Sequence, residues 1–148
     1  MRKLFVLSSA LALAGMMSAC TVIRELPPEA RAEIPQNEES ELCRALLTAF
    51  LENDANAFIA RLPEESRRNF TKQQFKTTRN AVVESMGEPI SFQYVTDLEL
   101  TAFTPHIWKI RFRRTDARTE QTFTSEALFR IITGRVDGKP VVIGFQFL

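Results

Sequence analysis

The chain has 148 residues, of which 45% are hydrophobic, and its 19 basic and 18 acidic side chains leave it close to neutral. This length suits one domain, and a neutral chain has no broad positive field to gather phosphate groups, so we expect no nucleic-acid partner. Two cysteines and a single histidine do not make a zinc cluster, and nothing else in the sequence calls for a metal or a cofactor.

The first nineteen residues have the order of a secretory signal. Two basic residues stand at positions 2 and 3, an apolar run follows, and the small Ser18 and Ala19 come just before Cys20. The alternative is a membrane-spanning helix, but the apolar run is shorter than the roughly 20 residues that cross a bilayer. The pattern therefore predicts that residues 1–19 are a signal peptide that is removed on export.

The segment Met17-Ser18-Ala19-Cys20 resembles the lipobox of bacterial lipoproteins, with Met17 in the place of the usual leucine. The resemblance implies cleavage before Cys20, lipidation of its thiol, and acyl chains such as palmitate on the new N-terminus. More than one buried acyl chain makes membrane anchoring effectively stable. In Gram-negative members an Asp after the lipidated Cys favours the inner membrane, so Thr21 implies an outer-membrane protein that faces the periplasm.

Residues 20–36 are predicted to form a flexible tether that starts at the lipidated cysteine. Prolines among alternating charges discourage both helix and sheet, and proline stiffens a spacer; they stand at positions 27, 28 and 35. We expect this segment to hold a folded domain, residues 37–148, away from the bilayer.

Helical spacing begins after the tether, where Leu42, Leu46 and Phe50 fall on one face and acidic residues occupy the first turn. Cys43 lies within this predicted helix, and lipidation of Cys20 would leave it without an internal disulfide partner. Its apolar neighbours favour a small buried side chain. The alternative, a reactive nucleophile or an intermolecular bridge, would require exposure or an activating base.

Two further helices are predicted before the pattern changes. Asn53 or Asp54 can cap the second, which ends before Pro63. The third begins at a capping box, in which Thr71 is followed three residues later by glutamine, and it stops at Gly87.

Beyond Gly87 the apolar residues alternate, as they do in strands that bury one face. Strands are predicted at residues 92–100, 106–113, 123–131 and 141–147, and Asp137-Gly138 is a strong signal for a hairpin between the last two. This order predicts an α+β domain, with three N-terminal helices packed on one face of a curved four-stranded antiparallel sheet.

Two segments of this domain are similar to the nuclear transport factor 2-like (cystatin-like) superfamily, and specifically to its small secreted domains of unknown function. They are the Ala-Phe-Leu-Glu-Asn-Asp corner at residues 49–54 and the closing Asp-Gly-Lys-Pro-Val-Val-Ile-Gly-Phe hairpin at residues 137–145. The resemblance covers residues 38–148. It implies a cone between the sheet and the helices that can serve as a pocket, with acids or bases on its wall in the enzymes.

Strand alternation predicts which polar side chains point into this cone. The inward candidates contain no carboxylate, and they are Tyr94, Thr96, His106, Trp108 and Ser125. An enzyme could use His106 as general base and Tyr94 as hydrogen-bond donor. The alternative is a partly exposed histidine at a strand entry and a tyrosine that satisfies its hydroxyl at the edge of the core.

The opposite face of the predicted sheet carries the basic residues Lys109, Arg111, Arg113 and Arg130. These could bind an anionic partner such as a glycan, a lipid headgroup or an acidic protein. The alternative is an ordinary solvated face, neutralised by cross-strand pairing with Asp97, Glu99 and Glu126.

The aromatic composition separates two classes of function. Twelve phenylalanines against one Tyr and one Trp indicate an apolar core or pocket in place of a hydrogen-bonding active site. We therefore predict a membrane-anchored lipoprotein with a non-catalytic binding or assembly domain, whose partner is a protein or an apolar small ligand. The alternative is a small-molecule carrier or enzyme that uses the pocket with Tyr94, His106, Trp108 and Ser125.

Overall fold

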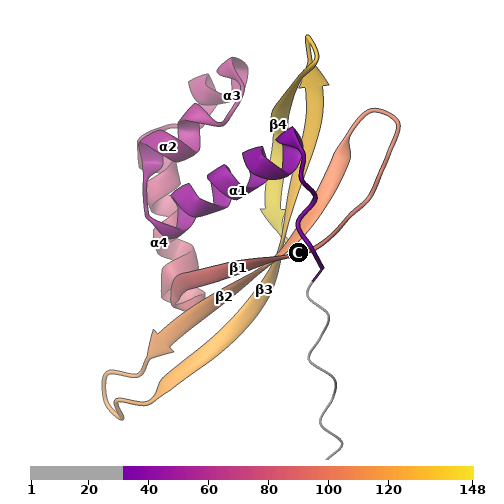
Figure 1. Cartoon of the computed structure of the whole chain (residues 1–148). Coiled ribbons are helices and arrows are strands. Elements are labelled where there is room, and N and C mark those ends of the chain that lie inside the picture. The colour runs from indigo at the N-terminus through magenta and orange to yellow at the C-terminus, as the bar shows by residue number, and fades with distance from the viewer. Residues whose placement is uncertain (1–31) are drawn as a thin grey trace, which may run out of the picture.

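The computed structural model describes residues 32–148, so the predicted signal peptide, Cys20 and most of the predicted tether lie outside the described residues. Helices come first and strands follow (Figure 1), in the order α1 (Glu38–Leu51), α2 (Ala55–Ala60), α3 (Glu64–Asn69), α4 (Lys72–Met86), β1 (Glu88–Asp97), β2 (Thr104–Thr115), β3 (Thr122–Val136) and β4 (Lys139–Phe147). Within the described range, none of the helices has both the length and the apolar character needed to span a bilayer.

Side-chain caps begin the helices where the sequence predicts them. Asp54 accepts the backbone N–H groups of the first turn of α2, and Thr71 and Gln74 form the predicted capping box of α4. Gly87 ends α4 with a φ of 96°, and a Cβ at this position would collide with the backbone carbonyl of Arg113. Glycine is therefore required where the chain turns from α4 into β1.

The structure contains a helix that the sequence pattern did not predict, because α3 lies between the predicted second and third helices. Pro63, which was expected only to stop the second helix, also occupies the N-cap of α3, with acids in its first turn and Arg67 and Arg68 in its last. None of the six residues of α3 is buried. A helix that buries no face has no apolar periodicity, so the signal that revealed the other helices was missing.

One open antiparallel sheet holds the strands in chain order, β1-β2-β3-β4. The helices lie on one side of this twisted sheet (Figure 1), with α1 and α4 in contact with strands and α2 packed against both of these helices. The predicted α+β architecture is thus confirmed at this level, with four helices in place of three within residues 32–148. The core consists of the inward side chains of the strands, including Trp108, Ile110 and Phe112 of β2, packed against Leu46 and Leu47 of α1.

The first strand differs from its prediction in position and in register. It runs from Glu88 to Asp97, and the leucines at 98 and 100, predicted as inward residues, lie beyond it and are exposed. A register shift separates Tyr94, opposite Trp108, from Thr96, opposite Ile107. One extra residue moves every later side chain to the other face. Thr96 is therefore exposed, and Asp97, predicted on the outer face, lies opposite the inward His106.

Candidate functional site

A pocket of about 250 Å³ opens between the helices and the strands β3 and β4. Its walls are mainly phenylalanine rings, with three polar residues, and the lining residues are Phe50, Phe58, Phe70, Phe75, Thr78, Arg79, Phe129, Phe145, Gln146 and Phe147. Thr78 and Gln146 are exposed and mark the edge at which the pocket meets solvent.

The two periodicities of the chain bring these rings together. Helical spacing puts Phe75 and Arg79 on the face of α4 that turns toward the sheet, and strand alternation puts Phe145 and Phe147 on the inner face of β4. The ring centroids of Phe129 and Phe147 are 4.8 Å apart, and those of Phe58 and Phe145 are 5.2 Å apart at an interplanar angle of 88°. Edge-to-face packing of this kind holds the rings in defined orientations around the pocket.

Arg79 is the charged residue of the pocket wall, and its side chain is almost fully buried, with 7% exposure. Its Nε donates to the carbonyl of Phe50 at 3.0 Å, and its Nη2 donates to the carbonyl of Leu51 at 3.3 Å and to Glu88 Oε2 at 2.9 Å. These carbonyls belong to the last turn of α1, where a cation also meets the negative end of the helix dipole. Sequence reasoning missed Arg79, because an arginine on an amphipathic helix is ordinarily a solvated residue.

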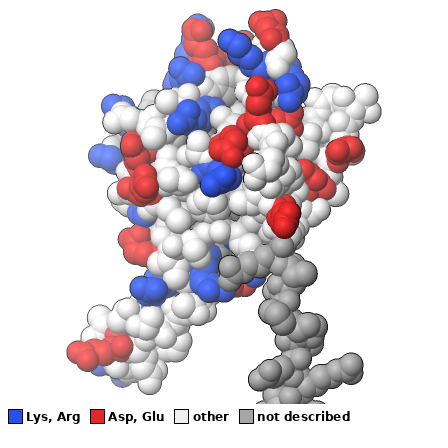
Figure 2. All heavy atoms as spheres, viewed as in Figure 1, with Lys and Arg blue, Asp and Glu red and all other residues white. Residues whose placement is uncertain are grey.

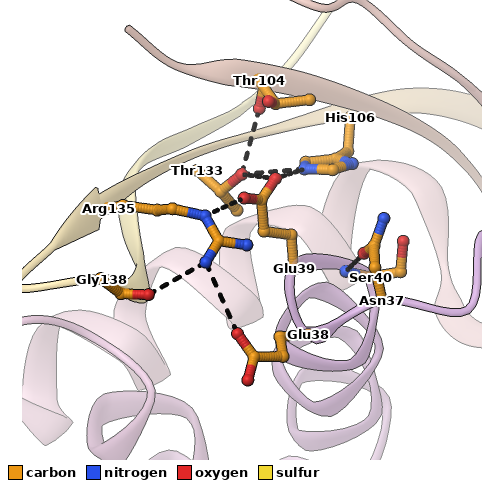
Figure 3. Close-up of polar contacts among 9 residues, drawn as sticks. All are labelled: Asn37, Glu38, Glu39, Ser40, Thr104, His106, Thr133, Arg135 and Gly138. Carbon is orange, nitrogen blue, oxygen red and sulfur yellow. Dashed lines mark hydrogen bonds and ion pairs between the residues drawn. The ribbon is translucent and has the colours of Figure 1, made fainter.

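A second polar cluster joins the start of α1 to the sheet (Figure 3). His106 Nε2 lies 2.9 Å from Thr133 Oγ1 and 3.8 Å from Glu39 Oε2, and Arg135 Nε donates to Glu39 Oε1 at 3.1 Å. Arg135 Nη1 also donates to the carbonyl of Gly138 at 2.9 Å. Residues distant in the sequence thus bind α1 to β2 and β3. Glu39 was interpreted only as a first-turn acid, and nothing in the pattern signalled its partner.

The structure brings together Tyr94, His106 and Trp108 but not Ser125. Tyr94 packs against Trp108 with ring centroids 5.4 Å apart, and His106 and Trp108 have at most 1% exposure. Ser125 is exposed and lies next to the end of α4, where its hydroxyl is 3.5 Å from the carbonyl of Met86. The partly exposed histidine of the sequence interpretation is wrong, since Thr133 and Glu39 provide polar neighbours in the interior.

Burial controls the protonation of these groups. It raises the pKa of the Tyr94 hydroxyl to about 12, with the Asp97 carboxylate adding to the effect. It lowers the pKa of His106 below 6.5, although the carboxylates of Asp97 and Glu39 oppose the shift. A solute cannot reach these side chains without opening the core. Their geometry is that of a polar network in the interior of the domain.

The lowered pKa of His106 predicts a pH-dependent stability. The unfolded chain binds a proton near pH 6.5 and the folded chain only at lower pH, so the free energy of unfolding should fall as pH drops below 6.5. The slope would be at most about 1.4 kcal/mol per pH unit. Urea denaturation at several pH values from 8 to 5 measures it. A His106→Asn variant should lose this component, and an identical pH dependence in that variant would contradict the assignment.

Cys43 is fully buried, as its apolar neighbours predicted. Burial raises the pKa of its thiol to about 12, the nearby Glu39 carboxylate adds to this shift, and interaction with the Trp108 indole opposes it. A thiol in this state is neither nucleophilic nor available for an intermolecular bridge.

The outer basic face is partly neutralised, by fewer acids than the sequence suggested. Glu126 Oε1 accepts from Arg111 at 2.8 Å, its Oε2 lies 3.2 Å from Lys109 Nζ, and these contacts hold the pKa of Glu126 below its usual range. Arg113 is exposed and Arg130 half-buried. Asp97 faces the interior after the register shift, and Glu99 lies beyond β1. On the side of the molecule seen in Figure 2, acids and bases are intermingled.

Comparison with known proteins supports the fold. No protein-family model matches the sequence, and no curated protein matches it. A ketosteroid isomerase-like protein from Erwinia carotovora atroseptica is similar in structure, with a TM-score of 0.53 and 13% identity over 73% of this chain and 90% of that chain. A SEC-C motif containing protein from Rhodopseudomonas palustris has a TM-score of 0.52 and 14% identity over 75% of this chain and 79% of that chain.

A third similar structure has a lower score. It is an NTF-2 like protein of unknown function from Shewanella oneidensis MR-1, with a TM-score of 0.43 and 11% identity over 72% of this chain and 93% of that chain. At this score the likeness supports no argument of its own. At these identities the similar structures concern the fold and leave the chemistry open.

Proposed function

We propose that the chain is a lipid-anchored envelope protein whose domain binds a small, largely apolar molecule in the phenylalanine pocket. The observation that supports this most is the pocket itself, a space of about 250 Å³ among seven phenylalanine rings. An apolar cavity of roughly 150 Å³ is already large enough to bind benzene. Apolar walls with a few polar groups at one edge are the usual character of a small-molecule site.

Accessibility favours this pocket over a reaction centre at His106. The phenylalanine pocket has exposed residues at its edge, Thr78 and Gln146, so a ligand can enter from solvent. His106, in contrast, is 1% exposed and holds its polar contacts inside the core. Ligand binding without catalysis is therefore a better interpretation than catalysis at His106. If the domain is a small-molecule carrier, we place its ligand in the phenylalanine pocket and not beside His106 and Tyr94.

The proposed anchor rests on the sequence alone. Lipidation at Cys20 would tie the domain to the outer membrane, on its periplasmic side, through a tether that ends where Asn37 caps α1. A domain held at a membrane surface can take up an apolar molecule that has limited solubility in water. The anchor and the pocket together therefore describe a membrane-attached binding protein.

Closing the mouth of the pocket tests the binding function. We expect the purified domain to bind naphthalene in equilibrium dialysis, and we expect a Thr78→Trp variant to bind it at least about tenfold more weakly, a loss of about 1.4 kcal/mol. Thr78 is exposed at the edge of the pocket, so a larger side chain there obstructs the entrance without changing the core.

The adjacent threonine provides the matched control. Thr77 is also exposed on α4 but does not line the pocket, so Thr77→Trp should bind naphthalene as the unmodified domain does. Equal affinity in both variants, or no measurable binding to the unmodified domain, would reject the pocket as the binding site.

A further inference from the structure

The lining of the pocket combines seven phenylalanine rings with one buried charge, and we infer from it that the ligand is an amphipathic carboxylate, with its apolar body among the phenylalanine rings and its carboxylate at Arg79. This inference rests on the proposed function, because it names the class of ligand for the same site. Its chemistry covers aromatic and aliphatic carboxylates alike.

Three of the ten lining residues are polar. Thr78 and Arg79 are neighbours on α4, Gln146 comes from β4, and the other seven lining residues are phenylalanines. Among the ten lining residues Arg79 is the charged one. A ligand that fits this lining has an apolar body and one polar end, and that end meets a positive charge.

The hydrogen bonds of Arg79 occupy one side of its guanidinium group. The bonds to the carbonyls of Phe50 and Leu51 and to the Glu88 carboxylate use Nε and Nη2, and none of them uses Nη1. A guanidinium has five N–H donors, two of them on Nη1. A carboxylate that accepts from Nη1 would form a charge-assisted hydrogen bond, which is shorter and roughly twice as strong as a neutral one.

Glu88, the counter-ion of Arg79, only partly neutralises the positive charge that Arg79 presents to the pocket. Glu88 is paired with Arg79 at 2.9 Å, but the Glu88 side chain is 59% exposed while that of Arg79 is 7% exposed. Solvent screens the exposed carboxylate, whereas the guanidinium faces an environment of aromatic rings in which electrostatic interactions are stronger. A cationic ligand would meet a like charge here, and a neutral ligand would forgo the interaction with Nη1.

Two isosteric probes test the inference. We expect 1-naphthoate to bind at least about tenfold more tightly than the neutral 1-naphthamide at pH 7.5 in equilibrium dialysis, because only the former completes the ion pair. Glu88→Gln removes a carboxylate that competes for Arg79, so it should tighten naphthoate binding several-fold and leave naphthamide unchanged. The matched control is Glu84→Gln, since Glu84 is exposed on α4, the helix that carries Arg79, and is not among the Arg79 contacts.

The outcomes separate this inference from the proposed function. Binding of both probes with equal affinity, tighter binding of the amide, or a naphthoate affinity that does not respond to Glu88→Gln would overturn the carboxylate assignment and leave an apolar site. A preference for naphthoate that persists in Thr78→Trp would place the anion outside the pocket and would also overturn it. If naphthalene and both probes fail to bind, the proposed function fails and the inference fails with it.

Discussion

Replacing Arg79 with methionine is expected to lower the free energy of unfolding by about 3–6 kcal/mol, since the buried guanidinium makes two hydrogen bonds to the backbone and each bond to a charged group contributes about 1.5–3 kcal/mol. The bonded carbonyls are those of Phe50 and Leu51, at the end of α1. Methionine keeps the volume of the aliphatic stem but offers no donor. The junction between α1 and α4 would therefore lose the two hydrogen bonds from Arg79 and keep the packing of Phe50 against Phe75.

Arg44 supplies the control for this prediction. It forms an ion pair of similar length, 3.0 Å, with Glu41, but its side chain is 46% exposed. Exposed pairs contribute about 0–1 kcal/mol, so Arg44→Met should change stability little. Urea denaturation of both variants measures the two effects. If the two substitutions cost the same, Arg79 does not hold the helices together, and its place in the pocket wall must have another reason.

The second large effect concerns the location of the protein in the cell. A Cys20→Ser variant is expected to lose membrane retention completely, because a hydroxyl in place of the thiol cannot receive the diacylglyceryl group that the lipobox resemblance implies. Each buried methylene of an acyl chain contributes about 0.8 kcal/mol, so anchoring by several chains is effectively all or none. Fractionation of the cell envelope, followed by an alkaline wash of the membranes, measures the retained fraction.

The other cysteine is the matched control. Cys43 is buried in α1 and takes no part in the proposed anchor, so Cys43→Ala should stay in the membrane fraction. The released Cys20→Ser protein should still bind naphthalene, because the pocket lies entirely within the folded domain. A Cys20→Ser protein that still resists the wash would show that the lipobox interpretation is wrong.

Much of the fold follows from local sequence chemistry. The capping box at Thr71, the stop at Gly87 and the hairpin signal at Asp137-Gly138 are interactions within a few residues of the chain, and each lies where the sequence predicts it. The burial of Cys43 follows from its place on an apolar helix face. The helix α3 escaped prediction because it buries none of its residues and so has no periodic pattern.

The candidate sites could be predicted only in part. The twelve phenylalanines indicated an apolar core or pocket, but no pattern within one segment shows that rings from three helices, the end of α3 and two strands leave a space between them. Inward polar residues were predicted by counting alternate positions, and the count failed at Thr96 because a register shift lies between it and Tyr94. A shift of this kind is a property of two paired strands, not of one.

The sequence by itself predicts an address at Cys20, which lies outside the described residues. It determined α1, α2 and α4, the order of the strands, and the caps and turns between them, because these depend on groups that are close along the chain. The tertiary structure alone decided that Arg79 would be buried beside the end of α1, that Glu39 would meet His106 and Arg135, and that a pocket would remain among the phenylalanine rings. The physical reason is distance along the chain. These contacts join residues 28 or more positions apart, so they exist only after separate elements of the fold have packed together.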